Sequence, residues 1–157
     1  MLDELTLRKA VEFAVKTEEA GAIFYKKLAR RFADNREVKE LFSSLAKEEE
    51  AHQATFQRFL QEVPDEVPYK SQQERLAVLR AMAMSEFFLG EDGLFKNLEK
   101  LTSVRDGLVR AYQLERNTLA YYLEIRELLG ASDVIDAIVI AEERHMLQMA
   151  ERLEALD

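Results

Sequence analysis

The sequence EEAH, from Glu49 to His52, returns as EERH from Glu142 to His145, and these two stretches contain both histidines of the chain. In each stretch a glutamate stands three residues before the histidine. Residues three apart lie on one face of an α-helix, so each stretch can direct a carboxylate and an imidazole to the same point. Two such helices, with one glutamate from each of two further helices, supply the ligands of a two-metal carboxylate site in a four-helix bundle.

The two further glutamates occur in an internal repeat. Residues 16–25 read KTEEAGAIFY, and they align with QLERNTLAYY at residues 113–122. Each segment has a glutamate at its third position and a tyrosine at its tenth: Glu18 and Tyr25 in the first, Glu115 and Tyr122 in the second. Because a Glu-x-x-His motif follows each segment, the chain is predicted to consist of two equivalent helix pairs.

Apolar residues recur at helical spacing in four long segments, and no segment shows the alternation of a strand. The predicted helices cover residues 4–33, 36–62, 104–130 and 133–156. The second helix is predicted to begin at a capping box, with Asp34 as N-cap and Glu37 as the third helical residue. Gly130 suits the position after the third helix, and Ser132 suits the N-cap of the fourth.

A long connection joins the two helix pairs, and it begins at Pro64 and Pro68, which break the helical pattern. It is predicted to contain two short helices within residues 69–102: one over 72–89, then a break at Gly90, then one over 91–100. The fold class that follows is all-α, an antiparallel four-helix bundle with one long crossover containing one or two short helices. A single long crossover is typical of ferritin-like bundles.

Composition restricts the function. A length of 157 residues fits a single domain, 1–157, and a formal net charge of -8 argues against nucleic acid as a partner. The absence of cysteine excludes disulfides, thiol catalysis and cysteine-ligated iron–sulfur centres. No apolar run approaches the ~18 residues that span a bilayer, and the acidic first residues are unlike a signal peptide. We therefore expect a cytoplasmic protein that does not act at a membrane.

Glu18, Glu49, Glu115 and Glu142 each lie in the middle of an apolar stripe that no lysine or arginine shares. Burying an unpaired carboxylate costs several kcal/mol. Two divalent cations would offset the four charges, and two neutral imidazoles would complete the ligand set. This mixture of oxygen and nitrogen donors suits iron or manganese better than structural zinc. One Glu-x-x-His match is common by chance, but two matched motifs within a repeat favour the metal site.

The acids and tyrosines near the motifs have less specific roles. Four acids stand one position off the stripes and are predicted to be solvated: Glu19, Glu48, Glu50 and Glu143. Tyr25 and Tyr122 lie two turns, roughly 10 Å, from the glutamates of their own segments, so we expect neither to bind metal. Two interpretations remain open for them: a supporting hydrogen bond to a ligand carboxylate from another helix, or an ordinary place in the core.

With these motifs the chain resembles the rubrerythrin branch of the ferritin-like superfamily, over both helix pairs. The resemblance implies a non-haem centre of two iron ions that is oxidised by hydrogen peroxide or dioxygen and then reduced again. It implies that Glu49 and Glu142 bridge the ions. The terminal ligands would then be Glu18 and His52 for one ion, Glu115 and His145 for the other. Members often assemble, so a homodimer or larger homo-oligomer is expected.

The sequence departs from the usual rubrerythrin pattern in two ways. Typical members carry a cysteine-ligated, rubredoxin-like iron domain that supplies electrons; this chain has no cysteine, so an external electron-donor protein is expected. Typical members also have a further glutamate three residues after the third-helix ligand, where this chain has Thr118. The six remaining ligands are similar to those of bacterioferritin-type ferroxidase centres. This departure argues against specialisation as a peroxidase.

The expected function is that of a di-iron, or di-manganese, oxidoreductase that couples Fe(II) oxidation to reduction of hydrogen peroxide or dioxygen. Oxidative-stress defence or iron handling is the expected role. Two alternatives stay open: a non-catalytic module that binds or stores iron, and a structural helical bundle with a vestigial site. The number of metal ions per chain and the speed of peroxide turnover distinguish these three.

Overall fold

The computed structural model describes residues 7–62, 98–129 and 133–156. Its helices are α1 (Leu7–Arg31), α2 (Arg36–Glu62), the short 3-10 helix η2 (Leu98–Lys100), α4 (Val104–Leu129) and α5 (Asp133–Ala155). The four long helices predicted from the sequence are confirmed. The predictions for a helix over 72–89, for the Gly90 break, and for Gly130 and Ser132 lie outside the described residues, and η2 is the described end of the predicted helix over 91–100.

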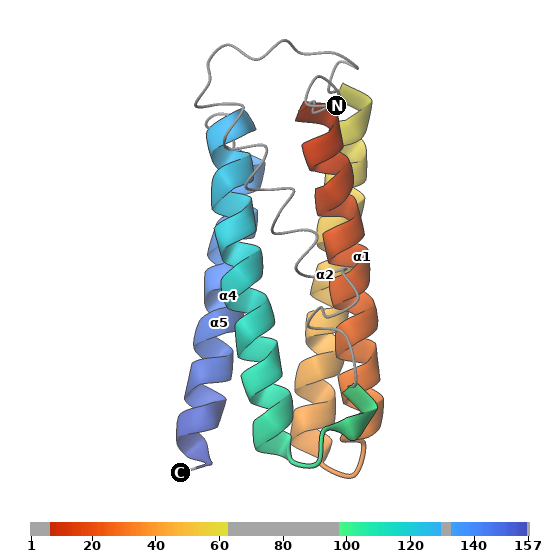
Figure 1. The fold of residues 1–157 in the computed structure, drawn as a ribbon, viewed down its shortest axis with the longest axis vertical. Coiled ribbons are helices and arrows are strands. Elements are labelled where there is room, and N and C mark those ends of the chain that lie inside the picture. The colour runs from red at the N-terminus through yellow and green to blue at the C-terminus, as the bar shows by residue number, and fades with distance from the viewer. Residues whose placement is uncertain (1–6, 63–97, 130–132, 157) are drawn as a thin grey trace.

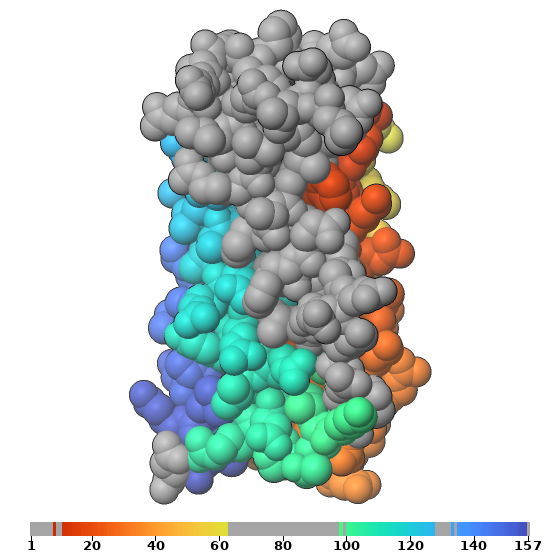
Figure 2. All heavy atoms as spheres, viewed as in Figure 1, coloured from red at the N-terminus to blue at the C-terminus, as the bar shows by residue number. Residues whose placement is uncertain are grey.

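The four long helices form two hairpins that pack side by side (Figure 1). Helix α1 packs on α2 and α4 packs on α5, while α1 and α4 also contact each other. In Figure 1, α1 and α5 run downward and α2 and α4 run upward, so neighbouring helices are antiparallel. In the space-filling view of the same face, α1 and α4 lie towards the viewer, with α2 and α5 at the edges (Figure 2). This is the predicted all-α bundle, without a strand in the part described.

A side-chain cap fixes where α2 begins. The backbone N–H of Val38 donates a hydrogen bond of 3.2 Å to Oδ1 of Asn35, which makes Asn35 the N-cap. The prediction of Asp34 as N-cap is therefore wrong by one residue, and Glu37 is the second residue of the helix instead of the third. The cap satisfies one of the backbone donors that the first helical turn leaves without a partner.

Apolar stripes from the four helices meet in the core, as their spacing of three and four residues requires. Aromatic rings within it hold two tyrosines in place. Tyr25 stacks on Phe42 with ring centroids 5.9 Å apart, and Tyr122 stacks on Phe56 at 5.2 Å. All four rings are fully buried, so the stacks fix two hydroxyl groups inside the bundle.

Substitution of Gly107 by alanine is expected to lower the free energy of unfolding by about 1 kcal/mol. An added Cβ would lie 2.7 Å from Cε2 of Phe32, a buried ring that itself packs against Phe42. Such overpacking costs roughly 1–3 kcal/mol, and the better helix propensity of alanine recovers up to about 1 kcal/mol. Urea unfolding of the metal-free protein measures the change, and an unchanged or raised midpoint would contradict the expected clash.

Candidate metal centre

The four long helices bring six side chains with metal-ligand chemistry to one place inside the bundle. Helix by helix, these are Glu18 of α1, Glu49 and His52 of α2, Glu115 of α4, and Glu142 and His145 of α5. Five of them are buried, whereas the side chain of His52 is 13% exposed. Each lies near the middle of its helix, so the site is far from the loops at either end of the bundle. The structure thus brings together every candidate ligand that the sequence indicated.

The six side chains form two overlapping groups, within each of which one donor atom per residue lies within 4.8 Å of all the others. One group contains Glu18, Glu49, His52 and Glu142. The other contains Glu49, Glu115, Glu142 and His145. Glu49 and Glu142 belong to both groups, which is the position expected of carboxylates shared by two metal ions.

Both imidazoles direct Nδ1 to the carboxylates. Nδ1 of His52 lies 3.1 Å from Oε1 of Glu142. Nδ1 of His145 lies 3.4 Å from Oε2 of Glu115 and 3.8 Å from Oε1 of Glu49. Ring nitrogens and carboxylate oxygens from all four helices therefore border one common space.

Several of the oxygen and nitrogen atoms that could bind metal around this space lack hydrogen-bond partners. Six of them are buried without a hydrogen bond: both oxygens of Glu142, one oxygen each of Glu18 and Glu115, and Nδ1 of His52 and His145. Buried polar atoms nearly always have a partner, because an unpaired one costs roughly 1–3 kcal/mol. A divalent cation in each group would satisfy these atoms and neutralise the carboxylates. The residues therefore fit a pair of metal ions.

Without metal, Glu49 and Glu142 bind protons more tightly than an ordinary carboxylate does. Burial, and then the neighbouring carboxylates, raise the pKa of Glu49 and Glu142 well above the ordinary value. Burial alone would also raise the pKa of Glu115, but the close imidazole of His145 outweighs it and lowers that pKa. Burial opposes the charging of His145, yet Glu115 and then Glu48 raise its pKa to about 9. Metal binding must therefore release protons from this site.

Two buried tyrosines hydrogen-bond the carboxylates across the bundle. The hydroxyl of Tyr25 on α1 donates to Oε1 of Glu115 on α4, and that of Tyr122 on α4 donates to Oε1 of Glu18 on α1. Burial and then the nearby carboxylates raise the pKa of both hydroxyls, so each keeps the proton that it donates. Of the two interpretations left open by the sequence, the structure shows the hydrogen bond to a glutamate of another helix.

Replacement of Tyr25 by phenylalanine is expected to lower the free energy of unfolding of the metal-free protein by about 2 kcal/mol, because a hydrogen bond to a charged group contributes roughly 1.5–3 kcal/mol. The ring and its stacking remain, but Oε1 of Glu115 loses its donor. Tyr112→Phe is the control, since the half-buried Tyr112 makes no hydrogen bond through its hydroxyl to any described residue. Urea unfolding compares the proteins, and equal losses in both variants would count against the role given to Tyr25.

One prediction about the neighbouring acids needs correction. Glu19, Glu50 and Glu143 are exposed, as predicted. The prediction that Glu48 is simply solvated is wrong: its side chain is 43% exposed, and its Oε2 lies 2.5 Å from Nε2 of His145. The reason is geometric, because Glu48 lies off the central stripe of α2 but on the side that meets α5. Its position in the sequence beside Glu49 gives no indication of that neighbour.

A glycine also shapes the site. A Cβ at Gly21 would lie 3.0 Å from Oε2 of Glu49 and 3.2 Å from its carboxyl carbon. Glycine within a helix is less favourable than alanine by roughly 0.5–1 kcal/mol. Here it leaves room for the carboxylate of Glu49 to lie close to the backbone of α1. A lone glycine inside a long helical pattern, three residues after Glu18, is the signal in the sequence that could have indicated this contact.

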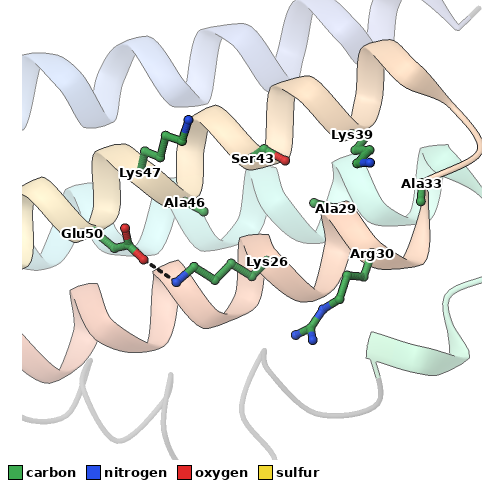
Figure 3. A pocket seen from close by; sticks show the side chains of 9 residues that line it. All are labelled: Lys26, Ala29, Arg30, Ala33, Lys39, Ser43, Ala46, Lys47 and Glu50. Atoms are coloured by element: carbon green, nitrogen blue, oxygen red, sulfur yellow. Dashed lines mark hydrogen bonds and ion pairs between the residues drawn. The ribbon is translucent and has the colours of Figure 1, made fainter.

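A groove on the outside of the α1–α2 pair is separate from the carboxylate cluster. Its charged lining residues are Lys26, Arg30, Lys39, Lys47 and Glu50 (Figure 3). The bottom of the groove consists of small side chains such as Ala29 and Ala46. No candidate ligand lines it, so the groove takes no part in the metal site.

The fold and the site together define a helical bundle of the carboxylate class, with candidate positions for two metal ions. Among protein-family models, the Rubrerythrin model matches residues 9–154, and the chain belongs to the rubrerythrin family. The resemblance drawn from the motifs and the ferritin-like fold are thereby confirmed. Comparison with curated proteins and with solved structures gave no match. None of the described helices is long and apolar enough to cross a membrane.

Proposed function

We propose that the protein is a non-haem di-iron oxidoreductase that couples Fe(II) oxidation to the reduction of hydrogen peroxide or dioxygen, with manganese as the alternative metal. The observation that carries the proposal is a set of six buried ligand atoms, carboxylate oxygens and imidazole nitrogens, that have no hydrogen-bond partner. The two matched helix pairs supply them. Membership of the rubrerythrin family supports the same centre. When bound, the metal ions would supply the electrons that reduce the oxidant.

The ligands in this proposal follow the two groups of donors. Glu18 and His52 would hold one ion, Glu115 and His145 would hold the other, and Glu49 and Glu142 would bind both. Tyr25 and Tyr122 each hydrogen-bond a single oxygen of a terminal glutamate, which leaves the second oxygen of that glutamate for metal. The surrounding helices exclude bulk water from all ligands except His52, which strengthens the attraction between the carboxylates and the cations.

The proposal also includes the partners and the type of the reaction. An external electron-donor protein that re-reduces the centre is part of the proposal, since none of the 157 residues is a cysteine that could ligate a second iron centre. Thr118 is buried one turn after Glu115 and offers no carboxylate there, which favours ferroxidase-type chemistry with six ligands over specialised peroxidase activity. A role in oxidative-stress defence or iron handling, and assembly as a homodimer or larger homo-oligomer, belong to the same proposal.

Stopped-flow absorbance on protein loaded anaerobically with Fe(II) tests this function. Mixing with hydrogen peroxide or dioxygen is expected to give the near-ultraviolet absorbance of ferric iron in proportion to the iron bound, and chemical re-reduction should permit further cycles. Faster oxidation of the bound iron by hydrogen peroxide would indicate peroxidase chemistry, and faster oxidation by dioxygen would indicate ferroxidase chemistry. Uptake of far more than two irons per chain would favour storage instead. Bound iron that neither oxidant oxidises would contradict the proposal.

A further inference from the structure

The two candidate metal positions have equivalent ligands but unequal surroundings. Alignment of the chain on its two Glu-x-x-His motifs pairs Glu48 of α2 with Ala141 of α5. The residue before the first motif therefore carries a carboxylate, and the residue before the second carries only a methyl group. Any contact that Glu48 makes with the opposite half has no counterpart in the other direction.

Glu48 makes such a contact with His145 on α5. Its Oε2 lies 2.5 Å from Nε2, while Nδ1 of the same ring lies 3.4 Å from Oε2 of Glu115 inside the cluster. A neutral imidazole that donates its Nε2–H to a carboxylate carries its lone pair on Nδ1. That is the nitrogen that faces the metal position. The carboxylate thus selects the tautomer, fixes the ring and makes Nδ1 a more basic ligand.

His52 lacks this support. Its Nδ1 also faces the cluster, 3.1 Å from Oε1 of Glu142, but its Nε2 has no hydrogen-bond partner among residues 7–62, 98–129 and 133–156. The side chain of His52 is 13% exposed, compared with 1% for His145. The ring of His52 is therefore held less firmly and is more open to water.

Apart from Glu48, the residues that hydrogen-bond the ligands of the two metal positions are equivalent. Each terminal glutamate accepts a hydrogen bond from one buried tyrosine: Glu115 from Tyr25, and Glu18 from Tyr122. The two central carboxylates belong to both groups of donors. The difference between the positions therefore depends on the Glu48 contact and on the greater enclosure of His145.

We propose that Glu48 is a positioning residue that makes the site of His145 and Glu115 the tighter of the two, so that the protein binds two divalent cations in two separate steps. The first ion occupies the group with His145, and the second occupies the group with His52. This inference rests on the proposed two-metal site and adds an order of filling to it. Carboxylates that support a metal-bound histidine in this way change metal affinity by roughly 10–100-fold.

Titration of the metal-free protein with Co(II), followed by visible absorbance, tests the inference. The native protein is expected to bind one equivalent tightly and a second more weakly. Glu48→Gln keeps the size of the side chain but removes its charge, and it should weaken the tight step roughly 10–100-fold while leaving the weaker step unchanged. Glu143→Gln is the matched control, because it removes the same charge from an exposed glutamate beside the ligand Glu142. Far-ultraviolet circular dichroism verifies that each variant is folded.

Two double variants show which histidine Glu48 acts through; each combines Glu48→Gln with the loss of one histidine. In His52→Gln, the change Glu48→Gln should again weaken Co(II) binding by the same factor. In His145→Gln, it should change nothing, because the ring that it supports is gone. Equal effects in both backgrounds, or equal losses from Glu48→Gln and Glu143→Gln, would overturn the proposed role of Glu48. If the native protein binds no stoichiometric Co(II), it is instead the two-metal function that fails.

Discussion

Replacement of Glu142 by leucine is expected to stabilise the metal-free protein and to abolish its stabilisation by metal. Glu142 belongs to both groups of candidate ligands, and neither of its buried oxygens has a hydrogen-bond partner. Leucine fills a similar volume and has no polar atom that must be buried without a partner. A buried polar atom without a hydrogen-bond partner costs roughly 1–3 kcal/mol, so we expect an increase of roughly 2 kcal/mol in the free energy of unfolding without metal.

With metal present, the native protein becomes the more stable of the two. A ligand that binds only the folded state, at 1,000 times its Kd, stabilises it by about 4 kcal/mol, so two ions contribute about 8 kcal/mol. At this chain length about 1 kcal/mol raises Tm by roughly 2–4 °C, which predicts a gain of more than about 15 °C. Glu142→Leu should lose nearly all of that gain.

Thermal unfolding with and without Mn(II) measures both effects in one experiment. Glu143→Gln serves as the control, since the exposed Glu143 is adjacent to Glu142 but belongs to neither group of candidate ligands. It should respond to metal as the native protein does. A Glu142→Leu variant that is less stable than the native protein without metal, or that retains the native response, would contradict the role assigned to Glu142.

The metal-free protein is expected to lose stability as the pH rises from about 5 to about 9, because its folded state binds extra protons. The pKa values of Glu49 and Glu142 are raised above the unfolded value of 4.5, so the stability from their protonation is complete below that value and is lost as the pH rises. His145 adds stability that is complete below 6.5 and lost as the pH rises through about 9. The lowered pKa of Glu115 acts only below 4.5, outside this window.

The metal-loaded protein should not lose this stability, since the bound cations replace the protons on the same atoms. The stability difference between loaded and metal-free protein therefore widens with pH, by about 1.4 kcal/mol per pH unit for each proton displaced. Urea unfolding across this range at constant ionic strength measures both forms. Stability of the metal-free form that stays level or rises towards pH 9 would show that the buried carboxylates do not hold the protons inferred for them.

The fold could be predicted because apolar spacing identifies the buried face of each helix without knowledge of its neighbours. Long apolar stripes, few glycines and prolines and an internal repeat together leave a four-helix bundle as the simplest arrangement. The start of α2 was predicted one residue too early, because Asp34 is also a residue type that favours the N-cap. Only the hydrogen bond from Val38 to Asn35 distinguishes them.

The six candidate ligands could be identified for a similar reason. A glutamate in the middle of an apolar stripe must face the core, and the chain has only two histidines to complete the set. The role of Glu48 could not be predicted from the sequence, and the lone glycine at Gly21 indicates a close approach without identifying its partner, because both contacts depend on how neighbouring helices are rotated. Glu48 matters because α5 presents His145 to it, and Gly21 because Glu49 of α2 lies against α1.

The metal content per chain after anaerobic loading with Fe(II), followed by removal of unbound metal, tests the two-metal site most directly. We predict two irons per native chain and essentially none that resist removal in Glu142→Leu. Native protein that retains no iron, or an amount that Glu142→Leu retains equally, would contradict the two-metal site and leave a helical bundle whose buried carboxylates serve another purpose.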